Sequence, residues 1–358
     1  MATIGKYYPR RVAQKASAPT WIPAGCSLVQ EIYEPASQKT FWVYNSSSDA
    51  TLHIRLPYGT TDFAQVTSVF NGSLGRLYAT TYPVVAYGGF LWTLRMSGSG
   101  KVFTVYVDKI DPVAGTVSDA QTLFTVTEGS NVTNMNLLFG LVSDNAGNIY
   151  IGFSASDGIN AYCKIFKFVI GTLAVTQLAT QTITVFGTPG AFAGIGLSGT
   201  TLYYGWSANA ATFKFSSVTT SGGSPTDIAS FSLGTTTSYA VGFQGYHVVA
   251  GVLYDATHSA VVTIGGDKIS KLVVINTSPL EFFVLVRTGT STVYREYSGA
   301  TKLTEVALTD LGGNLSCETI GAFDDTQSAY ATGRVTFGGY VGSAFYFIDA
   351  ATQGREVA

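Results

Sequence analysis

The sequence predicts an all-β protein, and this expectation rests on its composition and on the pattern of its apolar residues. Hydrophobic residues make up 46% of the 358 residues and charged residues only 12%, a balance typical of a folded chain rather than a disordered one. The residues it favours, Thr, Val, Tyr, Phe, Ser and Gly, suit strands and turns. No amphipathic pattern with the helical period of 3.6 residues extends beyond two turns. We therefore expect strands along the whole chain.

The clearest unit spans residues 137–184 and contains four runs separated by turns. The runs cover residues 137–142, 149–153, 162–168 and a more polar segment that ends near Thr184. The first turn contains Asp144, Asn145 and Gly147, which tolerate the left-handed backbone that a tight hairpin needs. Four short strands with the most polar one last resemble one blade of a β-propeller.

The same order of strands and turns recurs along the chain. Trp92, Tyr150 and Tyr203 stand at comparable points of three units, 58 and 53 residues apart. A near-regular recurrence of one unit is typical of repeat architectures, and this repeat length suits propeller blades. The chain therefore resembles the β-propeller superfamily, but it has no tryptophan–aspartate signature and no kelch double glycine at fixed positions.

Further units are expected on both sides of these. The first would have strands at residues 27–33, 40–44, 51–56 and 64–70, and the second at 90–94, 102–107 and an outer strand through Val126. The fourth would have strands at residues 191–197, 201–206, 212–215 and 228–233. A fifth is expected at 239–243, 248–254, 260–264 and 272–275, and a sixth at 282–287, 293–297 and 303–308. The last would occupy 319–323, 330–337 and 344–348.

The predicted architecture is a single β-propeller over residues 26–358, preceded by an extended N-terminal arm at residues 1–25. The repeat length favours seven four-stranded blades over six. The last unit lacks an outermost strand, and an open sheet edge would leave backbone groups unpaired. The simplest closure of the ring therefore takes a strand from the N-terminal region.

The N-terminal arm differs in charge from the rest of the chain. Residues 1–30 carry a formal charge of +4, whereas the whole chain carries −2. Large apolar side chains accompany these charges, which is unusual for an idle tail. We expect the arm to bind a partner through its basic and apolar side chains, which are Lys6, Tyr7, Tyr8, Arg10, Arg11, Lys15, Trp21 and Ile22.

The sequence predicts no catalytic residue, no cofactor-binding residue and no metal ligand. His53, His247 and His258 share no metal-ligand spacing, and the three cysteines Cys26, Cys163 and Cys317 form neither a zinc motif nor a disulfide framework. The best carboxylate clusters are Asp324-Asp325 and Asp144-Asn145. Paired acids could serve glycoside hydrolysis, but both clusters lie among turn-forming residues, so we expect them to stabilise turns.

These observations favour a non-enzymatic structural or binding module of a larger assembly. In composition and general style the chain resembles structural proteins of virus or phage particles, such as decoration, tail or receptor-binding proteins. This resemblance implies host recognition, other subunits and surface glycans as partners, and a place in a virion or other extracellular particle. Two alternatives remain open: a carbohydrate-active propeller, either lectin or glycoside hydrolase, and a cellular protein–protein scaffold.

The sequence also bears on export and on membranes. The N-terminus lacks the apolar core of a secretory signal, so synthesis in the cytoplasm without a signal peptide is expected. No run of about 18 apolar residues predicts a membrane span. There is no strong signal for nucleic-acid binding.

Overall fold

The computed structural model contains strands almost throughout, as the composition predicts. It describes residues 7–15, 22–24, 26–46, 51–57, 59–71, 76–81, 83–99, 102–127, 136–156, 160–184, 192–209, 212–232, 239–241, 243–266, 268–288, 291–307, 319–322, 334–341 and 344–352. Within these residues the one helical element is a single 3-10 turn, η1 (Phe243–Gly245). The described part of the chain contains no helix with the length and hydropathy of a membrane span. The all-β prediction is therefore confirmed.

The strands form sheets that follow one another along the chain. The first sheet contains β2 (Cys26–Glu34), β3 (Lys39–Ser46), β4 (Thr51–Arg55) and β5 (Ala64–Thr67). The second has the order β11 (Val117–Thr127), β10 (Val102–Ile110), β9 (Phe90–Ser99) and β6 (Val69–Asn71), with β8 (Val84–Tyr87) also paired to β9. The third has the order β15 (Ala174–Thr184), β14 (Asn160–Val169), β13 (Asn148–Ser156), β12 (Asn136–Ser143) and β7 (Arg76–Thr81).

The later sheets each have four strands. The fourth contains β16 (Phe192–Ser198), β17 (Thr201–Asn209), β18 (Thr212–Thr219) and β19 (Thr226–Ser232), and the fifth contains β20 (Tyr239–Val241), β21 (His247–Val249), β22 (Val252–Tyr254) and β23 (Ala260–Thr263). The sixth contains β24 (Lys268–Thr277), β25 (Leu280–Thr288), β26 (Ser291–Ser298) and β27 (Thr301–Ala307). The last has the order β1 (Tyr7–Lys15), β30 (Ala344–Thr352), β29 (Arg334–Val341) and β28 (Thr319–Ala322).

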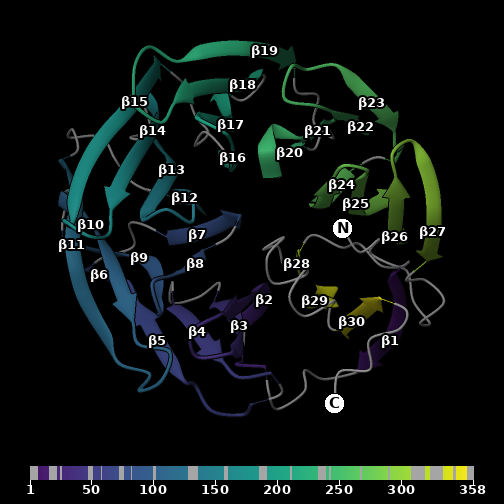
Figure 1. The fold of residues 1–358 in the computed structure, drawn as a ribbon, viewed down its shortest axis with the longest axis horizontal. Coiled ribbons are helices and arrows are strands. Elements are labelled where there is room, and N and C mark those ends of the chain that lie inside the picture. Colours follow the sequence, from purple (N-terminus) through teal and green to yellow (C-terminus); the bar gives the residue numbers. More distant parts are fainter. Residues whose placement is uncertain are drawn as a thin grey trace.

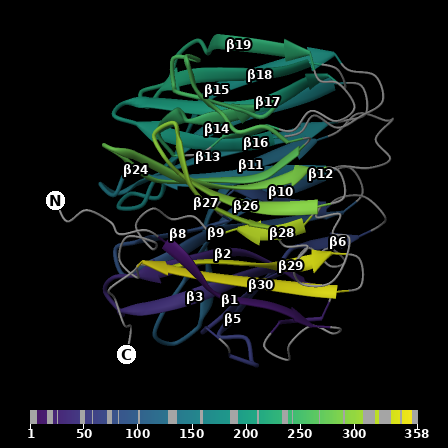
Figure 2. The ribbon, with the colours of Figure 1, turned by 90° about the vertical axis from the view of Figure 1, so that its right-hand side faces the viewer.

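These sheets surround a common centre, as blades do in a propeller (Figure 1). The strands β2, β12, β16, β20 and β24 lie toward the centre, and β5, β15, β19 and β27 lie at the rim. In the view turned by 90°, the strands of neighbouring sheets run across the disc in stacked layers (Figure 2). The architecture is therefore a propeller-like ring.

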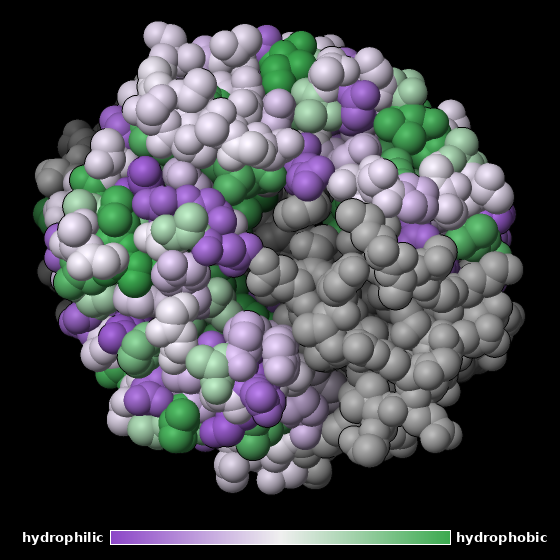
Figure 3. Space-filling view, viewed as in Figure 1, coloured by the Kyte–Doolittle hydropathy of each residue, from purple (hydrophilic) through white to green (hydrophobic). Residues whose placement is uncertain are grey.

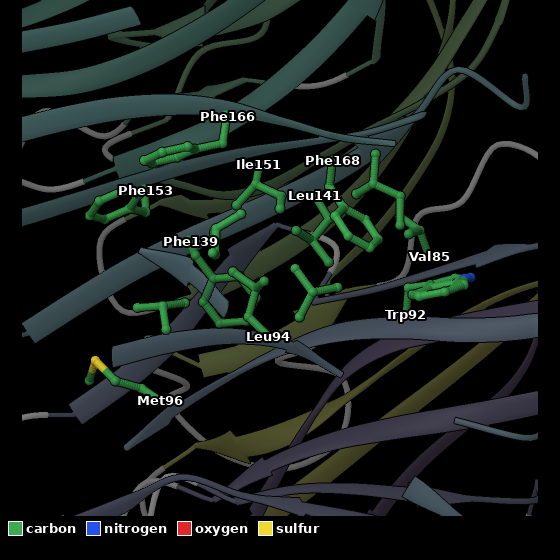
Figure 4. Close-up of a cluster of buried hydrophobic side chains, with 14 residues drawn as sticks. Val85, Trp92, Leu94, Met96, Phe139, Leu141, Ile151, Phe153, Phe166 and Phe168 are labelled. Carbon is green, nitrogen blue, oxygen red and sulfur yellow. The ribbon is translucent and has the colours of Figure 1, made fainter. Parts of the chain in front are cut away.

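The hydrophobic core lies between neighbouring sheets rather than at one central point. One cluster joins Trp92 and Leu94 of the second sheet to Phe139 and Phe168 of the third (Figure 4). In the same interface the Phe124 ring stacks on two rings of the third sheet at centroid distances of 4.4 and 4.9 Å. Separate buried clusters join the first sheet to the second, the third to the fourth, the fourth to the fifth and the fifth to the sixth. Burial of these faces holds the ring together.

Ring closure uses the first and the last of the described strands. β1 pairs antiparallel with β30, with Tyr7 opposite Thr352 and Lys15 opposite Phe345. In Figure 1 the purple strand β1 lies beside the yellow strand β30. The N-terminal region thus donates the outermost strand of the last sheet, as expected from the strand that this unit lacks.

Two details of the strand prediction are wrong. Residues 248–254, expected as one strand, form two strands with a turn at Ala250 and Gly251, both of which have positive φ. The segment 272–275, assigned to the fifth unit, belongs to β24 and opens the sixth sheet. The turn has no polar residue to mark it, so the apolar run continues through it.

A third difference lies between the second and third sheets. β6 and β8 both pair with β9, along different parts of the strand. β7, which lies between them in the sequence, pairs parallel with β12 of the next sheet. The chain therefore crosses to the neighbouring sheet and returns before it forms β9, and each of these two sheets gains a fifth strand.

Over the described residues on the face in view, hydrophilic and hydrophobic residues are interspersed (Figure 3).

Candidate functional site

The second sheet places one arginine between two aspartates. Arg95 on β9 donates from Nε to Asp108 Oδ2 on β10 at 2.8 Å, and its Nη2 group contacts Asp119 Oδ1 on β11. The guanidinium also lies over the Tyr106 ring, 4.5 Å from its centroid. We call Arg95, Asp108 and Asp119 the Arg95 cluster. A guanidinium suits this arrangement because it is planar and presents several donors in a fixed fork.

The two carboxyl groups of the Arg95 cluster differ in their environment. The Asp108 side chain is fully buried, whereas that of Asp119 is 68% exposed. Asp108 lies on the same strand face as Ile110, which packs against the first sheet. Its second oxygen, Oδ1, has no hydrogen-bond partner among the described residues. Burial raises the pKa of Asp108 to about 6, the neighbouring Asp119 adds to this, and the bond from Arg95 works against it.

The fourth sheet has a related cluster that is fully hydrogen-bonded. Asp227 Oδ1 on β19 accepts from Ser216 Oγ at 2.7 Å and from Gln181 Nε2 of the third sheet at 3.0 Å. Its other oxygen contacts Lys214 Nζ, and Ser216 in turn accepts from Trp206 Nε1 at 3.2 Å. Burial opposes ionisation, but these hydrogen bonds outweigh it and hold the pKa of Asp227 below its ordinary value. This cluster connects two sheets and leaves neither Asp227 oxygen without a partner.

Two histidines meet between the fourth and fifth sheets. His247 is fully buried, and its Nε2 lies 3.0 Å from Nδ1 of His258. The ring of Phe215 from β18 stacks on His247 at a centroid distance of 3.7 Å. Burial lowers the pKa of His247 to about 4. Sequence spacing did not suggest that these residues touch.

Several acidic residues stabilise turns, as predicted for Asp144. Its carboxylate accepts from the backbone N–H groups of Ala146 and Asn148 at 2.8 and 3.0 Å. Asp111 and Asp255 accept backbone N–H groups in their own turns in the same manner. Such local bonds explain an aspartate in a turn without any catalytic role. Asp324 and Asp325 lie outside the described residues.

The predicted partner-binding residues are placed only in part. Tyr7, Tyr8, Arg10, Arg11 and Lys15 belong to β1, whereas Lys6 and Trp21 lie outside the described residues. Ile22 is buried, with 5% of its surface exposed. That these residues bind another subunit stays a prediction, and so does the location of the protein in a particle.

The remaining candidates hold no metal site in the part of the chain that the structure describes. No group of three or more His, Cys, Asp or Glu residues there could hold an ion. His53 contacts Asp62 at 2.8 Å, and Cys26 and Cys163 are buried free thiols. Cys317 lies in a segment that is not described.

The Arg95 cluster was missed in the sequence. Its one signal is a charged residue within each of three strand-like runs, at Arg95, Asp108 and Asp119. Only the strand register shows that these residues are neighbours: Asp108 pairs with Asp119, and the register shifts directly before this pair because β11 has an extra residue, Ala120. Such a register cannot be counted from the residue numbers alone.

Solved structures with a similar arrangement include several enzymes. An α-L-arabinanase of Penicillium chrysogenum has a TM-score of 0.49 and 10% identity, with 97% of this chain and 98% of that chain covered. A GH93 α-L-arabinofuranosidase of Fusarium graminearum has a TM-score of 0.48 and 8% identity, with 97% and 98% covered. A subtype N10 neuraminidase-like protein of A/little yellow-shouldered bat/Guatemala/060/2010 has a TM-score of 0.47 and 10% identity, with 98% and 99% covered. No protein-family model matches the sequence, and no curated protein matches it.

These comparisons correct two expectations. The sequence favoured a non-enzymatic virion component, but the similar structures include several glycoside hydrolases, so that expectation is withdrawn. The expectation that the chain is not an enzyme is corrected on the same ground. At these identities no catalytic residue is transferred to this chain.

Proposed function

We propose that this chain is a carbohydrate-active propeller and that the Arg95 cluster contacts the sugar. The observation that carries the proposal is one guanidinium held between two carboxyl groups. One carboxyl is buried, with an oxygen that has no hydrogen-bond partner among the described residues, and the other is exposed. A buried acid with a raised pKa is costly to a fold, and such groups concentrate at functional sites.

The chemistry of the cluster suits a sugar. Neighbouring hydroxyl groups of a sugar both donate and accept hydrogen bonds, so they match a carboxylate beside a guanidinium. Asp119 and Arg95 reach solvent and would contact the ligand. Asp108 lies behind them and acts as a positioning residue, because its bond fixes the Nε side of Arg95.

Hydrolysis of a glycoside is a second candidate, favoured by the different environments of the two carboxyl groups. Glycoside cleavage uses one carboxyl that carries a proton and another that is ionised, and burial keeps a proton on Asp108 up to a pH of about 6. Cleavage would also require the substrate to reach Asp108 Oδ1. Assays of binding and of cleavage therefore separate the two candidates.

The test compares Asp119→Asn with the wild type on a glycan array and with aryl glycosides, including arabinosides. We expect an affinity about tenfold lower, since a hydrogen bond to a charged group contributes about 1.5–3 kcal/mol. Glu305→Gln is the matched control, because Glu305 is an outer-strand acid, 39% exposed, that contacts Arg295 as Asp119 contacts Arg95. Absence of any glycan binding by the wild type, or equal losses in both variants, would refute the proposal.

We also propose that each sheet is one blade, which makes seven blades. The support is the set of five four-stranded and two five-stranded sheets among the described strands. The two extra strands β6 and β7 come from one excursion of the chain and add no blade of their own. An electron-density map that resolves the ring counts the blades directly, and six would contradict this proposal.

A further inference from the structure

The hydrogen bonds of His247 and His258 determine which ring nitrogens carry a proton. Nδ1 of His247 lies 3.0 Å from the carbonyl oxygen of Gly245, and a carbonyl can only accept. His247 therefore carries its proton on Nδ1, which leaves Nε2 as an acceptor. His258 must then donate from Nδ1 across the 3.0 Å contact. One tautomer of each neutral ring satisfies both hydrogen bonds.

The same two rings lie at the interface of two sheets. Phe215 and Phe231 of the fourth sheet contact the pair, with Phe215 stacked on His247 at 3.7 Å and Phe231 edge-on to His258 at 4.8 Å. The acceptor Gly245 is close to the fourth sheet as well, since a Cβ atom there would lie 2.7 Å from Cγ of Tyr203. A displacement of either histidine ring would thus change the packing of both the fourth and the fifth sheet.

Uptake of protons by the pair has two distinct steps. The first proton fits on Nε2 of His258, because Nδ1 of that ring keeps its role as donor. A second proton would have to enter at Nε2 of His247, which would place two N–H groups face to face and remove the hydrogen bond between the rings. Two adjacent positive charges would also repel each other.

Among the described residues, few other groups influence the protonation of His247 and His258. Asp255, in the turn between β22 and β23, is the one ionised side chain with an electrostatic influence on both rings among the described residues, and it favours their charged forms. Tyr254 of β22 stacks on His258 at 4.1 Å, and the groups from β18 and β19 are the uncharged phenylalanines. Burial is the first cause that lowers the pKa of each histidine.

We propose that His247 and His258 form an acid-sensitive contact between the fourth and fifth sheets, which is closed when His247 is neutral and opens when both rings are charged. The sign follows from linkage. A histidine whose folded pKa lies below its unfolded value contributes stability at neutral pH, and this contribution is lost as the pH falls from about 6.5 toward 4. The fifth sheet should therefore loosen before the rest of the ring.

The test is hydrogen exchange of residues 243–263 and thermal unfolding, both between pH 7 and pH 4. We expect exchange of this segment to rise more steeply with acid than exchange of β13 and β14, and the melting temperature to fall by about 5 °C through this pair. His247→Gln and His258→Gln should each remove most of this pH dependence. The remaining histidine, His53, lies in the first sheet, so His53→Gln should keep the dependence and serves as the matched control.

Imidazole ¹⁵N spectra of the wild type provide a readout that does not require a folded variant. We expect His247 to stay neutral with its proton on Nδ1 down to about pH 5, while His258 becomes charged first. A charged His247 at pH 6, or segment exchange with the same pH dependence as β13 and β14, would overturn the proposal.

Discussion

The second and fourth sheets carry charged clusters at the same place in their strand register, yet they fill the central position differently. Asp108 pairs with Asp119 across β10 and β11, and Ser216 pairs with Asp227 across β18 and β19. A bulge directly precedes the central residue in each sheet. The serine gives Asp227 a donor and leaves it ionised, whereas Asp108 has a buried oxygen with no partner in the described part of the chain. The fold can therefore accommodate a serine at this position, as in the fourth sheet, but the second sheet has an aspartate there.

This contrast separates a structural role from a functional one. The cluster of the fourth sheet is explained by the hydrogen bonds that it contributes between two sheets. The Arg95 cluster also connects strands, but a serine would do so at lower cost, because burial of a carboxyl is unfavourable. The proposed sugar contact would explain why the fold bears the extra free-energy cost of a buried carboxyl here.

The largest effect is expected from Ser216→Asp, which gives the fourth sheet the centre of the second. The new carboxyl would be buried beside Asp227 and Lys214, so we expect the free energy of unfolding to fall by about 3 kcal/mol at pH 8. The loss should be smaller at pH 5, where the new acid can hold a proton. Urea unfolding at the two pH values measures this. Ser217→Asp, a half-buried position on the opposite strand face, is the control. An unchanged stability would remove the physical basis of the contrast.

A second prediction concerns Asp108→Asn, which keeps the shape of the side chain and removes its charge. Because the folded pKa is about 6 and the ordinary value is 3.8, the folded state retains a proton that the unfolded state releases. Stability from this group is therefore greatest at acid pH and falls as the pH rises through 6, by about 3 kcal/mol. The difference in unfolding free energy between variant and wild type should rise by this amount from pH 4 to pH 7.5.

This difference curve is needed because the histidine pair changes stability in the opposite direction over the same range. A flat curve for Asp108→Asn would mean that the buried carboxyl titrates like an exposed one.

The smallest effect is expected from Gln181→Met, which removes the side chain that connects the third sheet to Asp227. Gln181 donates to Asp227 at 3.0 Å and accepts from Tyr204 Oη at 2.9 Å, so we expect a loss of about 1 kcal/mol. Thermal unfolding against Gln177→Met, an exposed position on the same strand, measures this. Equal melting temperatures of the two variants would show that the connection contributes nothing.

Much of the fold could be predicted where local chemistry and strand pattern agree. The unit at residues 137–184 is found as four strands, β12 to β15, because Asp144 and Gly147 mark its first turn. The turn at Ala250 and Gly251 was missed because it lies within an apolar run. The excursion through β7 was missed because a parallel pairing with the next sheet leaves no local signal.

The candidate site was less accessible to sequence reasoning than the fold. Arg95 and Asp108 are 13 positions apart in the sequence, and their contact depends on the hairpin register of β9 and β10. The bulge at Ala120 on β11 then decides which residue of β11 faces Asp108. A pattern of residue types reveals neither the hairpin register nor the position of the bulge, so the sequence predicted no catalytic or binding residue there.

The pairing of β1 with β30 has a consequence for biosynthesis. During translation the strand from Tyr7 to Lys15 is made long before its partner, from Ala344 to Thr352. The last sheet can therefore be completed only after this partner has been made, and until then the nascent ring has two free edges. A truncated product that lacks its final residues would retain both edges, which are the surfaces at which β-proteins aggregate.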